Sequence, residues 1–567
     1  MRQKSRRCAT RVCTGIGAMA CGGILLAGPM SAQAFQFTLG DDIDGRWDNT
    51  FQYVGGMRVH GVNSGIGNNP VFNESEYKFD HAGSLVTNRL SDLTELTVSY
   101  RQNYGFRVSA SLFKDFAYND TVKSNPGFVA PGLPYSALGS YAGNRYSSYT
   151  RSYYESGTQL LDAFAYGNFE VGGHSTSVKL GRLAAVWGTA FFFGDQSISY
   201  AQNPVDGIKG SAAPGSTLKE LALPRGQIYM QTDVTPQLSL AAQYFFEFEH
   251  NLLPEGGTYL GLSDFLFYGP TQLLGAIPRG TDFKPRNVHN NFGIRATWSP
   301  DFMAGGNLSF YYRRLDEAQP WLLFGRDPAT GATNYHLSYN QNAQLFGVSA
   351  EAGLGNLSTG FELSYRHNTA LNSVAGPSLA DPSGRAGARG DTINLIANAL
   401  VPLKKTPLYE SATLIAELAF TQRVGSIKNA DLYHGTGNGL ACPTGSKWDG
   451  CATNNSIVAA MQFDPKWLQV FPGVDIDMPM FVMYGIYGNT PSLSTAVANQ
   501  GSLIYTIGLH SLIHNKYNVT LQYNGYHSHT GGTTRFAPGG PSFYAGGNGP
   551  FMWNDKPWVS LTLQTTF

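Results

Sequence analysis

A strict alternation of long and short connections constrains the fold of this chain more than any other feature. After Gly45 we count about eighteen segments (roughly 16 to 20) in which apolar and polar residues alternate. Successive segments are joined in turn by a short turn and by a long, glycine-rich loop. Because successive connections of an antiparallel sheet lie at opposite ends, every long loop falls at the same end. The pattern predicts an all-β fold: a transmembrane antiparallel up-and-down barrel with long extracellular loops and short periplasmic turns.

The last strand shows the alternation most clearly. One of its faces would carry Val559, Leu561, Leu563 and Phe567, and the residues between them are polar. Such a strand suits a wall with lipid on one side and a polar lumen on the other. Its aromatic end resembles the C-terminal signal recognised by the barrel-assembly machinery, although Thr565 stands where that signal favours an aromatic residue. On this stretch alone, a terminal strand of a soluble sandwich is the alternative.

Composition supports a membrane protein without membrane helices. Charged residues make up 14% of the chain, against roughly 25% in soluble domains. No segment after the amino terminus has the 18 or so apolar residues that a membrane helix needs. A membrane protein without spanning helices must be a closed barrel.

The amino terminus reads as a secretory signal. Residues 1–34 contain a basic region, an apolar region from Val12 to Met30, and the small-residue site Ala32-Gln33-Ala34. We expect cleavage after Ala34, leaving residues 35–567 as a single barrel domain in the outer membrane of a Gram-negative bacterium. The remaining chain carries more acidic than basic residues, which disfavours nucleic acid as a partner.

Two cysteines remain after removal of the signal. Cys442 and Cys451 are nine residues apart, and in an exported chain this spacing favours a disulfide that closes a loop. A metal pair completed by His434 is the alternative. We expect no cofactor.

Charged residues of the strands indicate the lumen wall. Alternation turns seven of them away from lipid: Glu95, Arg101, Arg107, Lys179, Glu362, Arg366 and Glu417. Their opposite charges nearly cancel, so a strong anion or cation filter is not expected. A wall tied by mutual salt bridges and a substrate path are both open interpretations.

The connection 188–225 is too apolar for a loop in water. It contains the cluster Phe191-Phe192-Phe193. One interpretation is that it folds into the barrel mouth, constricts it and offers an apolar surface to a ligand. The alternative is an outer lid packed on neighbouring loops.

No enzyme signature is present. The chain lacks Gly-x-Ser-x-Gly, His-Glu-x-x-His and a phosphate-binding glycine loop. His510 is expected to face the lumen and Ser511 to face lipid, which excludes a dyad between them. We therefore expect a protein that is not an enzyme.

Several motifs, kept in order along the chain, carry a family resemblance. They are Asn88-Arg89-Leu90, Leu180-Gly181-Arg182, Val186-Trp187-Gly188, Asn203-Pro204-Val205-Asp206, Lys219-Glu220-Leu221, Gly257-Thr258-Tyr259, Asp264, Leu345-Phe346-Gly347, Glu362-Leu363-Ser364-Tyr365-Arg366 and Val559-Ser560-Leu561. In these motifs the chain resembles the proteobacterial family of domain of unknown function 1302. The resemblance implies an exported outer-membrane barrel, of a kind often encoded near transporters or catabolic enzymes for hydrophobic compounds such as steroids. It supplies no catalytic or binding residue.

Two functions fit these observations. The first is a porin-like channel for uptake or passage of small, hydrophobic or amphipathic molecules, since barrels of roughly 16 to 18 strands enclose a lumen wide enough for solutes. The second is a structural or surface-interaction barrel with a plugged lumen. The expected partners are outer-membrane lipid, the barrel-assembly machinery and hydrophobic small molecules.

Overall fold

The computed structural model describes residues 35–567, except 214–217, 287, 304, 328–329, 381–382 and 495–498. The predicted signal peptide and its cleavage site at Ala34 lie outside the described residues. Within the described residues, no helix is long and apolar enough to cross a membrane.

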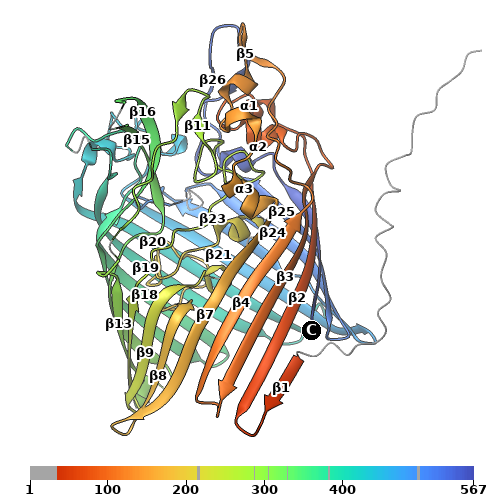
Figure 1. The fold of residues 1–567 in the computed structure, drawn as a ribbon, viewed down its shortest axis with the longest axis vertical. Helices are drawn as coiled ribbons and strands as arrows, with labels where there is room; N and C mark the ends of the chain where they lie inside the picture. Colours follow the sequence, from red (N-terminus) through yellow and green to blue (C-terminus); the bar gives the residue numbers. More distant parts are fainter. Residues whose placement is uncertain are drawn as a thin grey trace, which may run out of the picture.

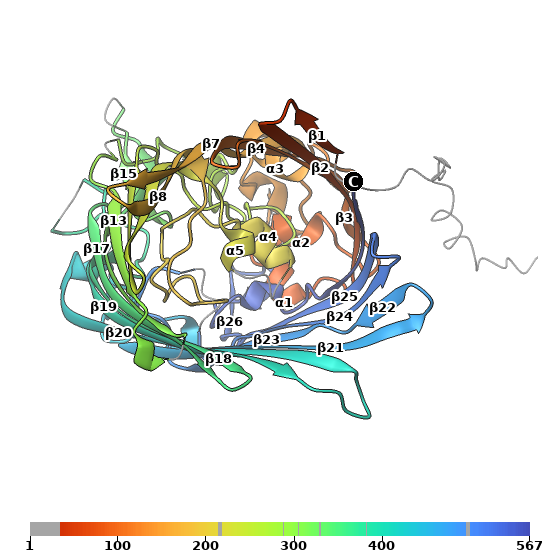
Figure 2. The ribbon, with the colours of Figure 1, turned by 90° about the horizontal axis from the view of Figure 1, so that it is seen from below.

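The described chain forms one closed antiparallel barrel of 18 strands (Figures 1 and 2). Its strands are β2 (Ile43–Arg58), β3 (Leu85–Tyr100), β4 (Tyr104–Asp115), β7 (Ser156–Val171), β8 (His174–Leu183), β9 (Arg225–Thr235), β10 (Leu238–Phe245), β13 (Phe292–Trp298), β14 (Asn307–Leu315), β17 (Ala343–Leu354), β18 (Leu357–Ala370), β19 (Arg389–Leu403), β20 (Ser411–Lys428), β21 (Asn455–Phe471), β22 (Val474–Asp477) with β23 (Met480–Tyr487), β24 (Leu503–Ile513), β25 (Tyr517–His527) and β28 (Trp558–Thr566). The barrel closes because β28 pairs with both β25 and β2. The predicted fold class and strand number are confirmed.

β22 and β23 together occupy one place in the wall, between β21 and β24. Pro479 lies at the break between them. Proline has no N–H to donate to a neighbouring strand, so the ladder is interrupted where it occurs. The break is bridged by two backbone hydrogen bonds, from Met478 to Pro465 (3.0 Å) and from Gly508 to Pro479 (2.8 Å).

The two faces of the wall differ as the alternation predicts. In β4, Phe106, Val108 and Leu112 are exposed on the outside, whereas Arg107 points into the lumen toward Glu95. An apolar exterior and a polar interior are the two faces that a membrane-spanning barrel requires.

The terminal strand closes the wall through its last residue. Phe567 exchanges two backbone hydrogen bonds with Asn49, of 2.8 and 2.9 Å, and its ring stacks on Phe51 with 5.1 Å between centroids. Leu561 and Leu563 are exposed on the same outer face. Recognition of this strand by the assembly machinery stays a prediction.

The long connections gather at one end of the barrel, the upper end in Figure 1. Their described residues include these short elements: α1 (Ser64–Gly67), α2 (Asn73–Tyr77), β5 (Phe128–Ala130), β6 (Leu133–Pro134), α3 (Ser148–Tyr154), β11 (Gln272–Leu273), β12 (Ile277–Pro278), β15 (Pro320–Arg326), β16 (Thr333–Tyr339), β26 (Thr533–Arg535), β27 (Ser542–Tyr544) and the 3-10 helices η1 (Tyr135–Leu138), η2 (Ala142–Asn144), η4 (Ala430–Leu432), η5 (Lys447–Asp449) and η6 (Phe551–Trp553). At the opposite end, β1 (Phe35–Leu39) forms a hairpin with β2. The core of the molecule therefore lies in the loops and the lumen, because the outer face of the wall is turned to lipid.

Candidate functional site

The connection between β8 and β9 enters the barrel. It spans residues 184–224, because the strand expected to reach residue 187 ends at Leu183; we call it the lumenal segment. It contains α4 (Gly207–Ala212) and α5 (Leu218–Leu221), which lie near the middle of the barrel cross-section in Figure 2. The connection turns inward early because Asn203 exchanges two hydrogen bonds with the backbone of Ala185.

Two carboxylates of the wall hold the first part of the lumenal segment. Glu362 of β18 accepts hydrogen bonds from the backbone N–H groups of Thr189, Ala190 (3.0 Å) and Ile198 (2.7 Å). Glu417 of β20 accepts three more, from residues 191, 192 and 193 at 2.5 to 2.9 Å. Both side chains are buried, and hydrogen bonds to a charged acceptor are stronger than neutral ones. These carboxylates therefore anchor the segment to the wall.

Two arginines bind the carbonyl groups that follow. Arg366 of β18 donates to the carbonyls of Asp195 (2.6 Å) and Ser197 (2.9 Å). Arg313 of β14 donates to those of Ile198 and Tyr200, both at 2.8 Å. The wall thus supplies acceptors for the N–H groups and donors for the carbonyls of a segment that has no regular ladder of its own, as buried backbone requires.

Apolar side chains of the segment fill the space between these anchors. Trp187 and Ile198 are buried against Tyr311 and Leu345 of the wall, and Phe193 is buried against β19, β20, β21 and β23. The close approach depends on small wall residues. A Cβ atom on Gly360 would lie 2.7 Å from the Thr189 side chain.

Two members of the phenylalanine cluster, Phe192 and Phe193, pack against the same group of wall residues. Phe193 is 5% exposed and belongs to the packing against the wall, so it offers no surface to a ligand. Phe192 packs on Phe481 with 5.2 Å between ring centroids. The apolar surface that the segment was expected to offer a ligand therefore does not include Phe193, because this side chain packs against the wall.

On its other side the lumenal segment leaves a cavity of about 970 Å³. The opposite wall of this cavity consists of the inner faces of β28, β2, β3, β4 and β7. Toward the extracellular end its lining is apolar and aromatic: Val86, Tyr118, Tyr154, Leu252, Tyr259, Leu260 and Trp558. Lower down it is polar, with Thr50, Gln52, Ser109, Ser111 and Gln564. The apolar and aromatic side chains of the open part of the lumen thus gather in its outer half, beside the charged groups of Arg89, Asp115 and Asp206, and its inner half is mainly polar.

Acidic side chains outnumber basic ones around the cavity. The acidic lining residues are Asp92, Glu95, Asp115, Asp162, Asp206 and Glu220, and the basic ones are Arg89 and Lys209. Arg107 lies between Glu95 and Asp162, which is 3.1 Å away, and neutralises part of this charge. The balanced wall expected from the sequence is therefore replaced by a mildly acidic cavity.

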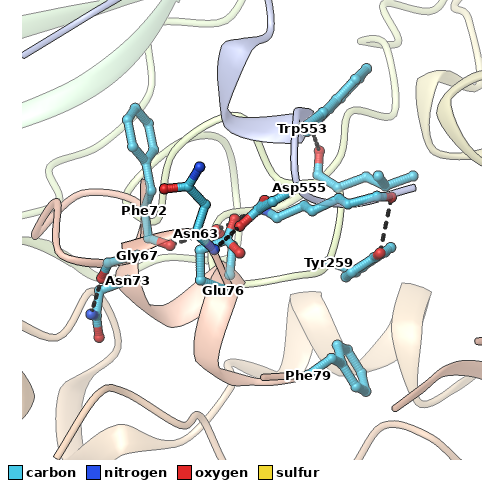
Figure 3. Close-up of polar contacts among 12 residues, drawn as sticks. Asn63, Gly67, Phe72, Asn73, Glu76, Phe79, Tyr259, Trp553 and Asp555 are labelled. Atoms are coloured by element: carbon cyan, nitrogen blue, oxygen red, sulfur yellow. Dashed lines mark hydrogen bonds and ion pairs between the residues drawn. The ribbon is translucent and has the colours of Figure 1, made fainter. Parts of the chain in front are cut away.

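The extracellular loops form a compact outer cap above this cavity. Its apolar core includes Phe72, Phe79, Tyr118, Tyr259 and Trp553, and several of its residues are also the upper lining of the cavity. Figure 3 shows the polar contacts that join its loops: the hydroxyl of Tyr259 donates to the carbonyl of Lys556 (2.9 Å) and the N–H of Asn63 donates to Asp555 (2.5 Å). The cap therefore forms the outer end of the cavity.

A cluster of four buried charges lies at the base of the outer cap. Arg58 contacts Glu76 at 2.7 Å and Asp555 at 3.0 Å, and Lys556 contacts Glu76 at 2.9 Å. Their side chains are at most 7% exposed. Because Arg58 ends β2 and Lys556 lies two residues before the start of β28, this cluster ties the cap to the seam where the barrel closes.

Glu255, also in the cap, holds its proton more strongly than an ordinary glutamate. Burial raises its pKa to about 8. One carboxyl oxygen accepts from the N–H groups of Tyr268 (2.8 Å) and Gly269 (2.6 Å). The other oxygen, Oε1, is buried and has no hydrogen-bond partner among the described residues, as suits a protonated carboxyl.

This pKa predicts that the cap loses stability as pH rises. The folded cap binds a proton that the unfolded chain releases near its ordinary value of 4.5, so the stabilisation is complete below 4.5 and is lost as pH rises through 8. Hydrogen exchange around residues 255–269, corrected for intrinsic rates, should be faster at pH 9 than at pH 5. Glu255→Gln should reduce this difference, to which Asp264 also contributes because burial raises its pKa to about 6, and Glu410→Gln, at an ion-paired turn on the other end, should keep it. An unchanged pH response in Glu255→Gln would contradict the assignment.

The structure joins Cys442 and Cys451 in a disulfide, with 6.0 Å between their Cα atoms. His434 lies beside this bond, with Nε2 3.7 Å from the Cys451 sulfur. Sulfurs bonded to one another are not thiolate ligands, so the metal alternative is not supported. The described residues contain no other cluster of acidic, cysteine and histidine side chains that could hold a metal.

The disulfide should be dispensable for the barrel. It closes a short loop, for which the chain-entropy estimate gives at most about 2 to 3 kcal/mol. Replacing both cysteines with serine should leave heat-modifiable migration on gels unchanged and accelerate hydrogen exchange only in the loop. Mass spectrometry after thiol blocking without reductant should find no free thiol in the native protein. Detection of blocked cysteines would contradict the pairing.

Sequence comparison identifies the family. The family model described as protein of unknown function (DUF1302) matches residues 15–567. The chain belongs to this family. No curated protein sequence matches it significantly. The motifs that indicated a DUF1302 resemblance are thereby confirmed as family membership.

Solved structures resemble the DUF1302 chain only distantly. OccK2 (OpdF) of Pseudomonas aeruginosa, in complex with glucuronate, is 10% identical, with 92% of this chain and 98% of that chain covered and a TM-score of 0.40. OccAB1 of Acinetobacter baumannii is 9% identical, with 95% and 98% covered and a TM-score of 0.40. The outer membrane channel DcaP of Acinetobacter baumannii is 8% identical, with 94% and 99% covered and a TM-score of 0.35. Similarity at this level does not indicate a shared substrate.

Two of the DUF1302 motifs meet at the lumenal segment and its anchors. Glu362 and Arg366 begin and end one motif, and they bind residues between Thr189 and Ile198, which follow the motif Val186-Trp187-Gly188. These two side chains and Glu417 were expected on the lumen wall. They do face the lumen, but the segment covers them, so they do not line an open path.

The remaining predicted residues lie in different places. Glu95 and Arg107 line the lumen as a partly exposed ion pair. Lys179 faces a smaller lumenal cavity of about 400 Å³. Arg101 is not part of the lumen wall: it lies in the turn after β3, paired with Asp42 at 3.0 Å and largely exposed. Its prediction is wrong because the strand ends one residue earlier, and alternation has no meaning in a turn.

Sequence reasoning missed Arg313, the cap cluster and Arg89. Arg313 lies between Tyr312 and Arg314 in β14, so the alternation of side chains along this strand could have predicted that it faces the lumen. His510, which faces the lumen, contacts Asp477 at 2.7 Å and Asn518 at 3.0 Å within the wall.

Proposed function

We propose that this protein is an outer-membrane channel for small, hydrophobic or amphipathic molecules. The observation that carries the proposal is the cavity of about 970 Å³ beside the lumenal segment. A solute would pass between this segment and the inner faces of β28, β2, β3, β4 and β7. The apolar outer half of the cavity favours solutes with an apolar body, and the polar inner half provides hydrogen-bonding partners on the way to the periplasm.

Export and assembly are part of the same proposal. Residues 1–34 would direct the chain across the inner membrane, and the terminal strand would be recognised by the barrel-assembly machinery. A transport role accounts for the cavity without requiring catalysis. The protein should fractionate with outer membranes, and its recovery from the soluble periplasm would contradict this location.

Reconstitution tests the channel directly. The purified protein in planar bilayers should give discrete conductance steps, and liposomes that contain it should swell in small neutral solutes. Deleting residues 190–200 should raise conductance because the segment fills part of the cross-section. The same deletion should reduce uptake of a hydrophobic solute, because it removes the packing and hydrogen bonds that hold Ile208, Ala212 and Leu223 of the segment beside the cavity. If neither measurement changes, the lumenal segment is not part of the path of the solute.

A surface-interaction barrel with a closed lumen is the second candidate. The compact outer cap with its buried charge cluster favours it, because such a cap closes the outer end of the cavity. In that case neither the native protein nor the 190–200 deletion conducts, whereas removal of the cap loops abolishes binding at the cell surface. Conductance of the native protein therefore separates the two candidates.

A further inference from the structure

Arg89 of β3 is the one basic side chain of the inner wall that reaches the 970 Å³ cavity without a polar partner among the described residues. Its guanidinium carbon lies 3.5 Å from the centroid of the Phe113 ring. A guanidinium stacked on an aromatic ring keeps its N–H groups at the edge of the plane, free to donate. Within the described part of the chain, Arg89 forms no hydrogen bond and no ion pair.

The acidic groups near Arg89 are already engaged. Asp115 accepts hydrogen bonds from the Thr87 hydroxyl (2.7 Å) and from the N–H groups of Asn88 and Ala117, both at 2.9 Å. Asp206 accepts from the N–H of Lys209 (2.9 Å) at the start of α4. These carboxylates supply negative charge to the cavity while leaving the N–H edge of Arg89 unoccupied.

Apolar and aromatic side chains share the cavity with Arg89. Val86, Tyr154, Leu252 and Tyr259 line the same cavity. A ligand that filled this part would bury an apolar body against them and present an acceptor oxygen to Arg89. An unpaired donor in an apolar site is the usual means by which a cavity selects the polar group of its ligand.

We propose that Arg89 binds the oxygen of an uncharged amphipathic solute, a molecule with an apolar body and a hydroxyl or carbonyl group. A carboxylate would be repelled because acidic residues outnumber basic ones around the cavity. The ammonium group of an amine can only donate hydrogen bonds, whereas the N–H groups of Arg89 require an acceptor. This inference rests on the proposed channel function and names the chemical class that the channel takes.

Calorimetry with three matched probes tests the inference without requiring conduction. Cyclohexanol, cyclohexanecarboxylate and cyclohexylamine share one ring and differ in the polar group. The native protein should bind cyclohexanol most tightly. Arg89→Met should weaken cyclohexanol binding about tenfold, in line with about 1.4 kcal/mol for one lost hydrogen bond, and Arg89→Lys should recover it only in part, since lysine lacks the planar stacked fork.

Arg295→Met is the matched control. Arg295 also faces the lumen beside an aromatic ring, 5.6 Å from that of Trp187, but it donates to Gln231 (3.0 Å) and lines the smaller cavity. The Arg295→Met variant should bind cyclohexanol as tightly as the native protein does. Equal binding by native and Arg89→Met protein, with heat-modifiable migration showing that both are folded, would overturn the inference, and so would tighter binding of the carboxylate. A native protein that conducts while either result is obtained would leave the channel function standing.

Discussion

Glu362→Gln combined with Glu417→Gln should release the lumenal segment from the wall. The two carboxylates accept six backbone N–H groups between them, and each substitution places an amide NH₂ where an acceptor is needed. Loss of a charged hydrogen-bond acceptor costs about 1.5 to 3 kcal/mol, so the double variant should favour a detached segment. Conductance in planar bilayers should rise several-fold, and residues 187–200 should become accessible to protease.

The barrel should survive this change because its strand pairing does not involve the segment. Glu351→Gln is the control: Glu351 also faces the lumen from β17, but it accepts only one side-chain hydrogen bond, from Asn307 at 3.0 Å. It should leave conductance and protease resistance unchanged. If the double variant keeps residues 187–200 protected, the apolar packing of Trp187, Phe193 and Ile198 is sufficient to hold the segment, and the anchoring role of the carboxylates is wrong.

Arg58→Met should destabilise the outer cap by about 3 to 5 kcal/mol, the usual effect of removing one partner of a buried ion pair. Glu76 and Asp555 would then remain buried with Lys556 as their only cation in the cluster. Hydrogen exchange of residues 60–84 and 546–557 should accelerate strongly, and protease added to intact cells should cleave these loops. Adding Glu76→Gln to Arg58→Met removes one orphaned carboxylate and should restore part of the protection.

Arg107→Met provides the contrast. Arg107 also lies between two carboxylates, but its side chain is 38% exposed, and exposed pairs contribute about 0 to 1 kcal/mol. It should therefore leave the cap unaffected. Equal protection of the cap in Arg58→Met and Arg107→Met would show that its apolar core, and not the charge cluster, holds it closed.

Residues far apart in sequence explain why the candidate site could be predicted only in part. Alternation correctly placed Glu362, Arg366 and Glu417 on the inner face, and the apolar character of Phe192 and Phe193 indicated a segment withdrawn from water. What these groups contact could not be read from either pattern. Glu417 binds backbone groups more than 220 positions earlier, and no local pattern reports such a distance.

The sequence by itself determined the barrel, its approximate strand number and the side of the wall on which most side chains lie, and it favoured the disulfide over a metal pair. These are local properties. The alternation of apolar and polar residues with a period of two indicates which face of a strand meets lipid, and the length of each connection indicates at which end of the barrel it lies. Tertiary structure alone decided that four charged wall residues anchor a segment and do not line a path, that Arg58, Glu76, Asp555 and Lys556 form one cluster, and that Arg89 is left unpaired beside a cavity. The physical reason is that a charged side chain on the inner wall either binds a loop that covers it or lines the open lumen. Which of the two occurs depends on the position of the loop inside the barrel, and that position depends on packing and hydrogen bonds with many strands at once.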